Sequence, residues 1–424
     1  MNENDKRPLA AHNFDFLYDK NYYSEILYTN HFSGKNLSYR IIEDCTITPY
    51  NFSNGGGIFD QDGNYIRGSS YIRRNEDGVS GTSDTTHEPS KDSVIFIGTL
   101  ANVWGHFITD SMSMLWFLKS RAYTEKFSRC RLVYLPAQGF VLKGNHKRLL
   151  EILGINLSML EPVTTAVKYK NLILPDECFF KSENGIFFTP EYRGLADAVR
   201  NFALDNIRPT KHRKYYFSYS RYKSNRSIGE DKLEKYFASK GYGIVYPEKL
   251  SLDEQLNILI NCDSFASTLG SCAHNVIFLK DRSQTVIIPR YSRLNSYQQA
   301  LDDVHDLDIN YVDSSFSIFK DKNESWKSPS LYFVSSNLRR FFNDSDTGHI
   351  ISVSDFRKYI RTVKGIRADS SWGCPSKADN PDTYRYYSTI ASEYFGYVFS
   401  QGWLCRFRRM LDNMKKAAKK IFRR

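Results

Sequence analysis

Residues 263–289 read DSFASTLGSCAHNVIFLKDRSQTVIIP, and this stretch decides the class of fold. A buried strand is expected at 263–268, a Gly-containing turn opens into a helix over 270–280, and a second apolar strand follows at 284–289. Strands that alternate with helices assemble into parallel sheets covered on both faces. The stretch therefore predicts an α/β fold.

The same alternation extends towards the N-terminus in two blocks. The nearer block predicts strands at 214–221 and 242–247 and helices at 230–240 and 251–261, the last with a Ser251/Glu254 capping box. The farther block predicts strands at 94–98, 131–136 and 171–175 and helices at 103–121, 146–153 and 190–206. Residues 1–90 hold shorter strand-like pieces, with a hairpin turn expected around Asp62-Gly63.

The two blocks separate near Asn206–His212, so the sequence predicts two doubly wound, Rossmann-like domains that face a cleft. We expect an N-terminal domain over 1–208 and a second domain over 209–325. A mostly helical extension is expected over 326–400 and a basic amphipathic helix over 401–424.

Composition narrows the class of protein. The 424 residues are 41% hydrophobic and 25% charged, which is typical of a soluble globular chain. The N-terminal residues have no apolar core, so no signal peptide is expected, and no run approaches the roughly 20 apolar residues of a membrane span. The seven cysteines form no C-x-x-C pair, which predicts neither a zinc site nor a disulfide framework but reduced, cytosolic thiols.

The positive charge is concentrated in the last residues. Residues 401–424 hold nine Lys or Arg and one Asp, so they carry +8 of the net charge of +11. Their apolar residues share one helical face: Trp403, Phe407, Met410, Leu411, Met414, Ala418 and Ile421. This pattern predicts a helix lying in an anionic membrane interface, the alternative being a helix packed on the protein with a solvated basic face. A nucleic-acid binder would spread its charge over the folded surface, so no nucleic acid is expected.

Two segments of the second block could hold an anion. Gly270 lets the backbone approach a ligand closely, Ser271 adds a hydroxyl, and His274 and Asn275 stand in the first turns of the following helix, whose N-terminus would favour phosphate. Arg221 and Arg226 flank a loop at the same expected sheet edge, where they could clamp a diphosphate. The alternatives are an ordinary strand-to-helix turn and a solvated basic loop.

The helix expected at 103–121 carries polar residues on one face. If Asn102 caps it, His106 and Asp110 follow at i+4 and i+8. A histidine near a helix N-terminus tends to be neutral, as a general base must be, and a neighbouring carboxylate could orient it. The alternative is that His106 and Asp110 only cap or bridge elements inside the fold.

Four segments in register carry a resemblance to a family. NVWGHFITDSMSMLW, SRYKSNRSIGE, YPEKLSLDEQLNIL and STLGSCAHNVIF, within residues 94–290, resemble glycosyltransferase family 61, which includes bacterial capsule and surface-polysaccharide enzymes. The chain departs from the family pattern at two points. His106 stands four residues after Asn102 rather than three, and Leu269 replaces a histidine that many members have before the glycine of the turn.

The resemblance implies a GT-B fold and a hexosyl- or pentosyltransferase that inverts the anomeric carbon without a metal or other cofactor. A nucleotide-sugar donor would bind the second domain, held by Arg221, Arg226, Glu248, Gly270, Ser271, His274 and Asn275. The first domain would receive a glycan or lipid-linked acceptor, with His106 or Asp110 as base and Asn102 beside them. Such an enzyme is expected in the cytoplasm, peripheral to the inner face of a bacterial membrane.

Three rival interpretations remain. Metal-dependent transfer would use an Asp-x-Asp triplet, but the three triplets, at 60–62, 306–308 and 344–346, fall in expected turns and polar connections. A polyol-phosphate transferase would use the same arginines. A non-catalytic membrane or nucleic-acid adaptor would act through residues 401–424 alone.

Overall fold

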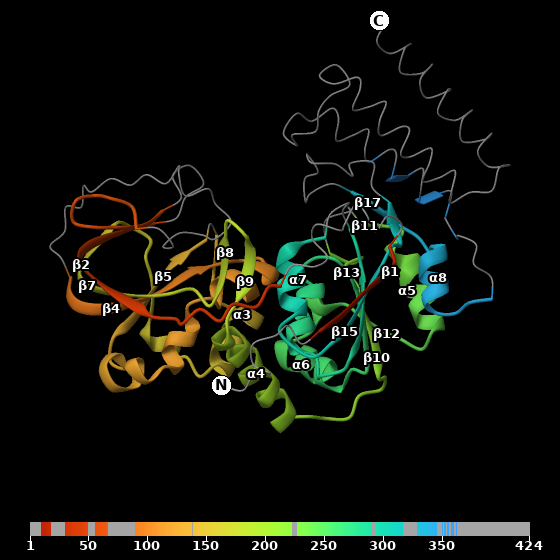
Figure 1. The fold of residues 1–424 in the computed structure, drawn as a ribbon, viewed down its shortest axis with the longest axis horizontal. Helices are drawn as coiled ribbons and strands as arrows, with labels where there is room; N and C mark the ends of the chain where they lie inside the picture. Colours follow the sequence, from red (N-terminus) through yellow and green to blue (C-terminus); the bar gives the residue numbers. More distant parts are fainter. Residues whose placement is uncertain are drawn as a thin grey trace, which may run out of the picture.

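The structure, a computed structural model, describes residues 10–17, 30–49, 56–66, 90–137, 139–222, 227–290, 294–316 and 329–345, with single positions between 350 and 362. Two α/β lobes lie side by side in this part of the chain (Figure 1), and each is centred on a six-stranded sheet. The predicted mixed α/β architecture with parallel sheets is confirmed. Residues 401–424, and with them the predicted basic helix, lie outside the described residues.

The second lobe contains an all-parallel sheet with the order β1-β15-β14-β13-β10-β12. Its strands are β1 (Ala11–Phe16), β10 (Lys214–Phe217), β12 (Gly243–Val245), β13 (Ser264–Thr268), β14 (Gln284–Ile288) and β15 (Asp308–Val312). Tyr215 and Phe265 belong to the apolar cluster of α6 (Leu252–Asn261), whereas their neighbours Tyr216 and Ala266 belong to that of α5 (Glu230–Ser239). Helices thus cover both faces, which explains the nearly continuous apolar runs of the strands.

The strand order reverses between β10 and β13. From β10 the chain passes to the edge strand β12 and then returns to the other side of β10 as β13. In open parallel sheets, ligands bind at such a reversal, beyond the carboxyl ends of the strands. Residues 218–221 follow β10 and Gly270-Ser271 follow β13, so the fold brings the predicted anion-binding segments to this point.

The first lobe has a mixed sheet with the order β3-β2-β7-β4-β5-β6. Its strands are β2 (Tyr39–Thr48), β3 (Gly57–Phe59), β4 (Ser90–Leu100), β5 (Arg131–Pro136), β6 (Leu160–Pro162) and β7 (Val167–Pro175). The pairs among β4 to β7 are parallel, whereas β2 is antiparallel to both β3 and β7. This lobe therefore departs from the predicted doubly wound form, because residues 39–59 add an antiparallel edge. The turn predicted around Asp62-Gly63 is present, closed by Gly63 N–H to Asp60 O at 3.1 Å.

The N-terminal strand belongs to the second lobe. Residues 11–16, which the sequence assigns to the first domain, pair in parallel with β15. His12 Nε2 lies 2.7 Å from Asp303 Oδ1, so a side-chain hydrogen bond adds to the strand pairing. The predicted boundary near residue 208 therefore does not apply to this segment, which pairs with residues almost 300 positions away.

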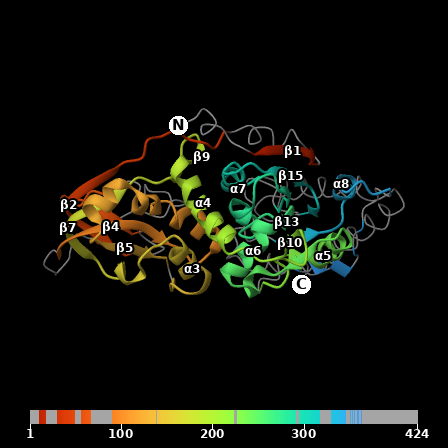
Figure 2. The same cartoon turned by 90° about the horizontal axis from the view of Figure 1, so that it is seen from below.

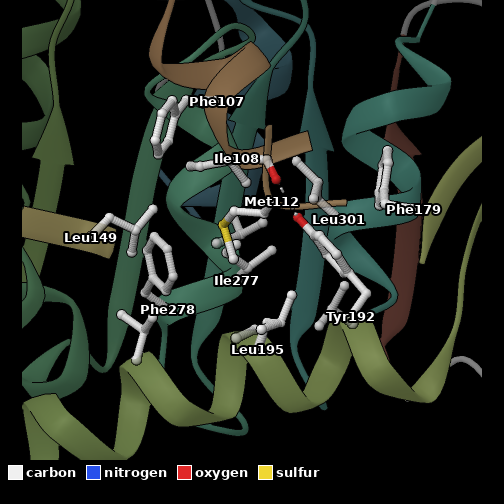
Figure 3. Packing of buried hydrophobic residues seen from close by; sticks show 14 of the residues in the cluster. Phe107, Ile108, Met112, Leu149, Phe179, Tyr192, Leu195, Ile277, Phe278 and Leu301 are labelled. Atoms are coloured by element: carbon white, nitrogen blue, oxygen red, sulfur yellow. Dashed lines mark hydrogen bonds between the residues drawn. The ribbon is translucent and has the colours of Figure 1, made fainter. Parts of the chain in front are cut away.

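Helix α4 (Pro190–Asp205) lies where the lobes meet (Figure 2). Its Tyr192 and Leu195 point into the apolar cluster that also contains Met112 of the first lobe and Ile277 of the second (Figure 3). At the periphery, Arg148 Nε lies 3.1 Å from Asp253 Oδ1 across the lobes. The lobes therefore share one apolar cluster. Among the described residues no helix has the length and apolar character needed to span a membrane.

The remaining elements complete the two lobes. The helices are α2 (Trp104–His106), α3 (Gly144–Ile152), α7 (Ser296–Asp302) and α8 (Ser336–Phe341), and the strands β8 (Phe179–Ser182), β9 (Gly185–Phe188), β11 (Ser227–Ile228), β16 (Ser315–Phe316) and β17 (Ser330–Tyr332). Of the helical extension predicted over 326–400, the structure describes β17, α8 and a few positions after them.

Candidate active site

The segment predicted as one helix over 103–121 is divided into short helical pieces. Helix α2 (Trp104–His106) continues as a π-helical turn over Phe107–Ser111, and a 3₁₀ turn follows at Leu115–Lys119. The residue before α2 is the extended Val103, which forms no side-chain cap. The N-cap position is therefore Val103 rather than the predicted Asn102. Isolated π-helical turns occur often at functional sites.

His106 and Asp110 form a hydrogen-bonded pair in this turn. His106 Nδ1 lies 2.9 Å from Asp110 Oδ2, and their side chains are 21% and 3% exposed. Thr109 Oγ1 lies 3.1 Å from Asp110 Oδ1, so hydroxyl and imidazole both orient the carboxylate. When Nδ1 carries the ring proton and donates it to Asp110, Nε2 is the basic nitrogen. The pair has the geometry of a base with its orienting carboxylate.

The preceding two residues contact the second lobe. A β-carbon on Gly105 would lie 2.7 Å from His274 Nδ1 and 3.0 Å from Ser271 Oγ, so a side chain at this position would have to displace these groups or the turn itself. Trp104 Nε1 donates a hydrogen bond of 2.9 Å to Asn275 Oδ1. The predicted base and the Gly-containing turn, about 165 residues apart in sequence, therefore lie next to each other.

The turn after β13 has an open side. Gly270 has φ +146°, and no heavy atom lies within 4 Å of a β-carbon built there. The predicted helix over 270–280 is a 3₁₀ helix over Ala273–Phe278, and the N–H groups of Ala273 and His274 both donate to Gly270 O. These two N–H groups are already satisfied. The N-terminus of this helix therefore offers fewer N–H groups to a phosphate than the sequence predicted.

The other predicted donor residues lie along the same sheet edge or outside the described part. The Arg221 guanidinium lies 3.9 Å from the centre of the Tyr246 ring, just after β12. Glu248 is exposed in the 3₁₀ turn Pro247–Lys249. Arg226 lies in the segment 223–226, which the structure does not describe, so its role stays a prediction. Asn102 is exposed, with its Nδ2 3.9 Å from a β-carbon built on Gly139.

The structure adds two groups at this edge that sequence reasoning missed. Arg290 stands two residues after the end of β14, with its guanidinium 5.9 Å from the centre of the Tyr219 ring. Glu230 is fully buried at the start of α5, and burial raises its pKa to about 7. Its Oε2 has no hydrogen-bond partner among the described residues. For Arg290 the sequence did contain a signal, because this arginine stands immediately after the strand predicted at 284–289, where ligand-binding residues of a parallel sheet are expected.

The Asp-x-Asp triplets have structural surroundings where they are described. Asp60 accepts hydrogen bonds from the backbone of Asp62 and Asn64, which lower its pKa. Asp306 lies 3.6 Å from Arg282, and Asp344 pairs with Lys240. Within the part of the chain that the structure describes, no three His, Cys, Asp or Glu side chains are placed to hold a metal ion together.

Comparison with known proteins finds a family model that matches the central part of the chain. The family model described as Glycosyltransferase 61 matches residues 104–288, a range that begins at Trp104 and ends with β14. No curated protein matches the chain. Among solved structures, the dodecameric iron-containing heptosyltransferase TibC in complex with ADP-D-beta-D-heptose aligns at 12% identity and a TM-score of 0.23, over 72% of this chain and 83% of that one. A TM-score this low does not establish a shared fold.

Proposed function

Since residues 104–288 belong to glycosyltransferase family 61 and the chain is accordingly a glycosyltransferase, we propose that it moves a sugar from a nucleotide-sugar donor to a glycan acceptor with inversion and without a metal. The observation that carries the proposal is the contact between the two halves of the site. His106 and Asp110 of the first lobe adjoin Ser271 and His274 of the second through Gly105.

The donor would bind the second lobe at the reversal of strand order. Arg221 after β10 and the open side of the turn at Gly270 both face the carboxyl edge of the sheet, where nucleotides bind in this class of fold. Guanidinium groups bind phosphate with paired hydrogen bonds and a fixed positive charge, which is the role a metal plays elsewhere. Arg226 would complete the clamp, and Glu248 would contact the ribose or base.

The acceptor would be activated in the first lobe. His106 Nε2 removes the proton of an acceptor hydroxyl while Asp110 stabilises the resulting imidazolium. The hydroxyl oxygen forms a bond to the anomeric carbon, and the bond from that carbon to the diphosphate oxygen breaks. The electron pair leaves with the diphosphate, whose charge the arginines neutralise. Attack from the face opposite to the leaving group inverts the anomeric centre.

The family and the basic sequence at residues 401–424 support a proposal about the domain arrangement of the enzyme and its place in the cell. A two-domain GT-B arrangement would place donor and acceptor on facing domains. The basic, amphipathic sequence at 401–424 would hold the enzyme on the inner face of a bacterial membrane, where lipid-linked precursors of capsule or lipopolysaccharide are extended.

A screen with nucleotide sugars tests the proposal. The full chain is incubated with UDP-, GDP-, ADP- and CDP-linked sugars, and release of nucleoside diphosphate and thermal stabilisation are measured. One donor should be consumed, and NMR of the product should show the anomeric configuration opposite to that of the donor. A phosphodiester in the product would instead indicate a polyol-phosphate transferase, and retention of configuration would contradict direct displacement.

A further inference from the structure

Helix α5 presents two carboxylates to the loop that carries Arg221. Glu230 and Glu234 are four residues apart and therefore share one face of the helix. The loop they contact, residues 218–221, follows β10 at the reversal of strand order. Neither carboxylate belongs to the residues assigned above to donor, acceptor or base.

The Glu234 carboxylate accepts hydrogen bonds from three hydroxyl groups that belong to two segments of the chain. Ser218 Oγ donates to Glu234 Oε1 at 2.6 Å, and Ser220 Oγ donates to the same oxygen. Tyr246 donates its phenol proton to Glu234 Oε2 at 3.0 Å, and burial together with this hydrogen bond raises the pKa of Tyr246. One carboxylate thereby ties the loop after β10 to the residue after β12.

Tyr246 in turn supports Arg221. The guanidinium lies 3.9 Å from the ring centre, well within the range of a cation–π contact. Arg221 is otherwise an exposed side chain, and ordering such a side chain on ligand binding costs free energy. A ring already fixed by Glu234 reduces that cost.

Glu230 holds the backbone of the same loop. Its Oε1 accepts from Tyr219 N–H at 3.0 Å, from the Tyr216 hydroxyl at 3.1 Å and from Ser218 Oγ at 3.4 Å. The two carboxylates therefore share Ser218. Together they fix both the path of the loop and the surface on which the arginine rests.

We propose that Glu234 is a positioning residue that, with Glu230 securing the loop backbone, holds Arg221 ready for the diphosphate of the donor through Tyr246. The inference rests on the proposed function, because it needs Arg221 to bind a diphosphate. It predicts that Glu234 acts on ligand affinity only while Arg221 is present.

Calorimetric titration of the full chain tests this with UDP, GDP, ADP and CDP, of which the tightest binder is then used. Glu234→Gln keeps the size of the side chain but replaces one acceptor oxygen by a donor, so Tyr246 or the serines lose their partner. Its Kd should rise about three- to tenfold, the cost of ordering one long side chain. Tyr246→Phe, which keeps the ring but loses the link to Glu234, should cause a similar loss, and Tyr246→Leu a larger one.

A double-mutant cycle separates positioning from a general structural effect. In an Arg221→Ala background, Glu234→Gln should cause no further loss. Asp231→Asn is the matched control, since it removes a carboxylate that pairs with Lys232 on the same helix and should leave the Kd unchanged. In turnover assays Glu234→Gln should lower kcat/KM for the donor, because Arg221 also stabilises the departing diphosphate, and the same change in the Arg221→Ala background should not lower it further.

The outcomes are distinct. The inference is overturned if the losses of affinity caused by Glu234→Gln and Arg221→Ala are additive. It is also overturned if the Kd is unchanged in both Glu234→Gln and Tyr246→Phe. In either case the proposed function still stands. If the wild-type chain binds none of the four nucleoside diphosphates, the proposed donor site is wrong and the inference falls with it.

Discussion

Gly105 packs directly against His274, so closely that a β-carbon at position 105 would lie 2.7 Å from His274 Nδ1. Ser271 Oγ would be only 3.0 Å away. Because His106 is the next residue, the placement of the candidate base relative to the second lobe depends on the absence of a side chain at 105. The first prediction follows from this contact.

Gly105→Ala should reduce turnover strongly in folded protein. The added methyl forces the turn at 104–106 away from His274, and a displacement of about 1 Å at reacting groups can cost on the order of 10²-fold in rate. Gly194→Ala is the control, because no heavy atom lies within 4 Å of a β-carbon there. It should keep turnover and stabilise α4 by up to about 1 kcal/mol. Unchanged turnover in soluble, folded Gly105→Ala would show that the contact does not matter for catalysis.

Glu230 should make the stability of the second lobe dependent on pH. Burial raises its folded-state pKa from 4.5 to about 7, so between these values the folded state binds more protons than the unfolded state. Stability from this group is therefore present at and below pH 4.5 and is lost as pH rises to about 7, by at most about 3 kcal/mol. The free energy of unfolding, measured with urea at pH 5 and at pH 8, should differ less between the two pH values for Glu230→Gln than for the wild type. Equal differences would mean that Glu230 titrates normally.

Local chemistry made much of the second lobe predictable. The Ser251/Glu254 capping box is present, and the strands at 264–268 and 284–288 lie within the predicted ranges, because caps and apolar runs depend on nearby residues. The pairing of β1 with β15 was not predictable, since no local pattern specifies a partner almost 300 residues away.

Within the candidate site, sequence identified the residues but not their arrangement. The spacing of His106 and Asp110 indicated a pair, and the pair exists, yet the π-helical turn that contains Asp110 has the same apolar pattern as an ordinary helix. Glycine at 105 gave no signal either, because its role lies in the approach of His274 from the other lobe. Contacts between lobes are fixed by tertiary packing, which a single sequence does not display.

Removal of residues 401–424 should release the protein from anionic membranes. The segment carries +8, and each basic residue near an anionic surface contributes about 1 kcal/mol. Sedimentation with phosphatidylglycerol vesicles should recover the full chain but not the truncated one, and phosphatidylcholine vesicles should recover neither. A variant with Lys415, Lys416, Lys419 and Lys420 changed to Gln should bind at an intermediate level. Equal recovery of truncated and full chains would place membrane binding elsewhere.

Turnover should survive chelation of divalent metals. The proposed diphosphate site uses guanidinium groups, and Asp60 and Asp344 already bind a turn backbone and a lysine. Activity is measured after dialysis against EDTA and after return of Mg²⁺ or Mn²⁺. Loss of activity that either ion restores would contradict metal independence and return attention to the carboxylates of the site.

His106→Ala and Asp110→Ala should each reduce turnover by roughly 10²–10⁴-fold, the usual contribution of a positioned acid or base. Donor affinity should change little, because the second lobe is proposed to hold the donor. Asp110 orients the ring through the 2.9 Å contact to Nδ1, so the double variant should lose hardly more than the worse single variant. We expect Asp110 to matter at least as much as His106, since the buried carboxylate also accepts from Thr109. Turnover, donor Kd and melting temperature are measured on the same samples. If both variants melt earlier but turn over in proportion to their folded fraction, the pair is structural and the base lies elsewhere.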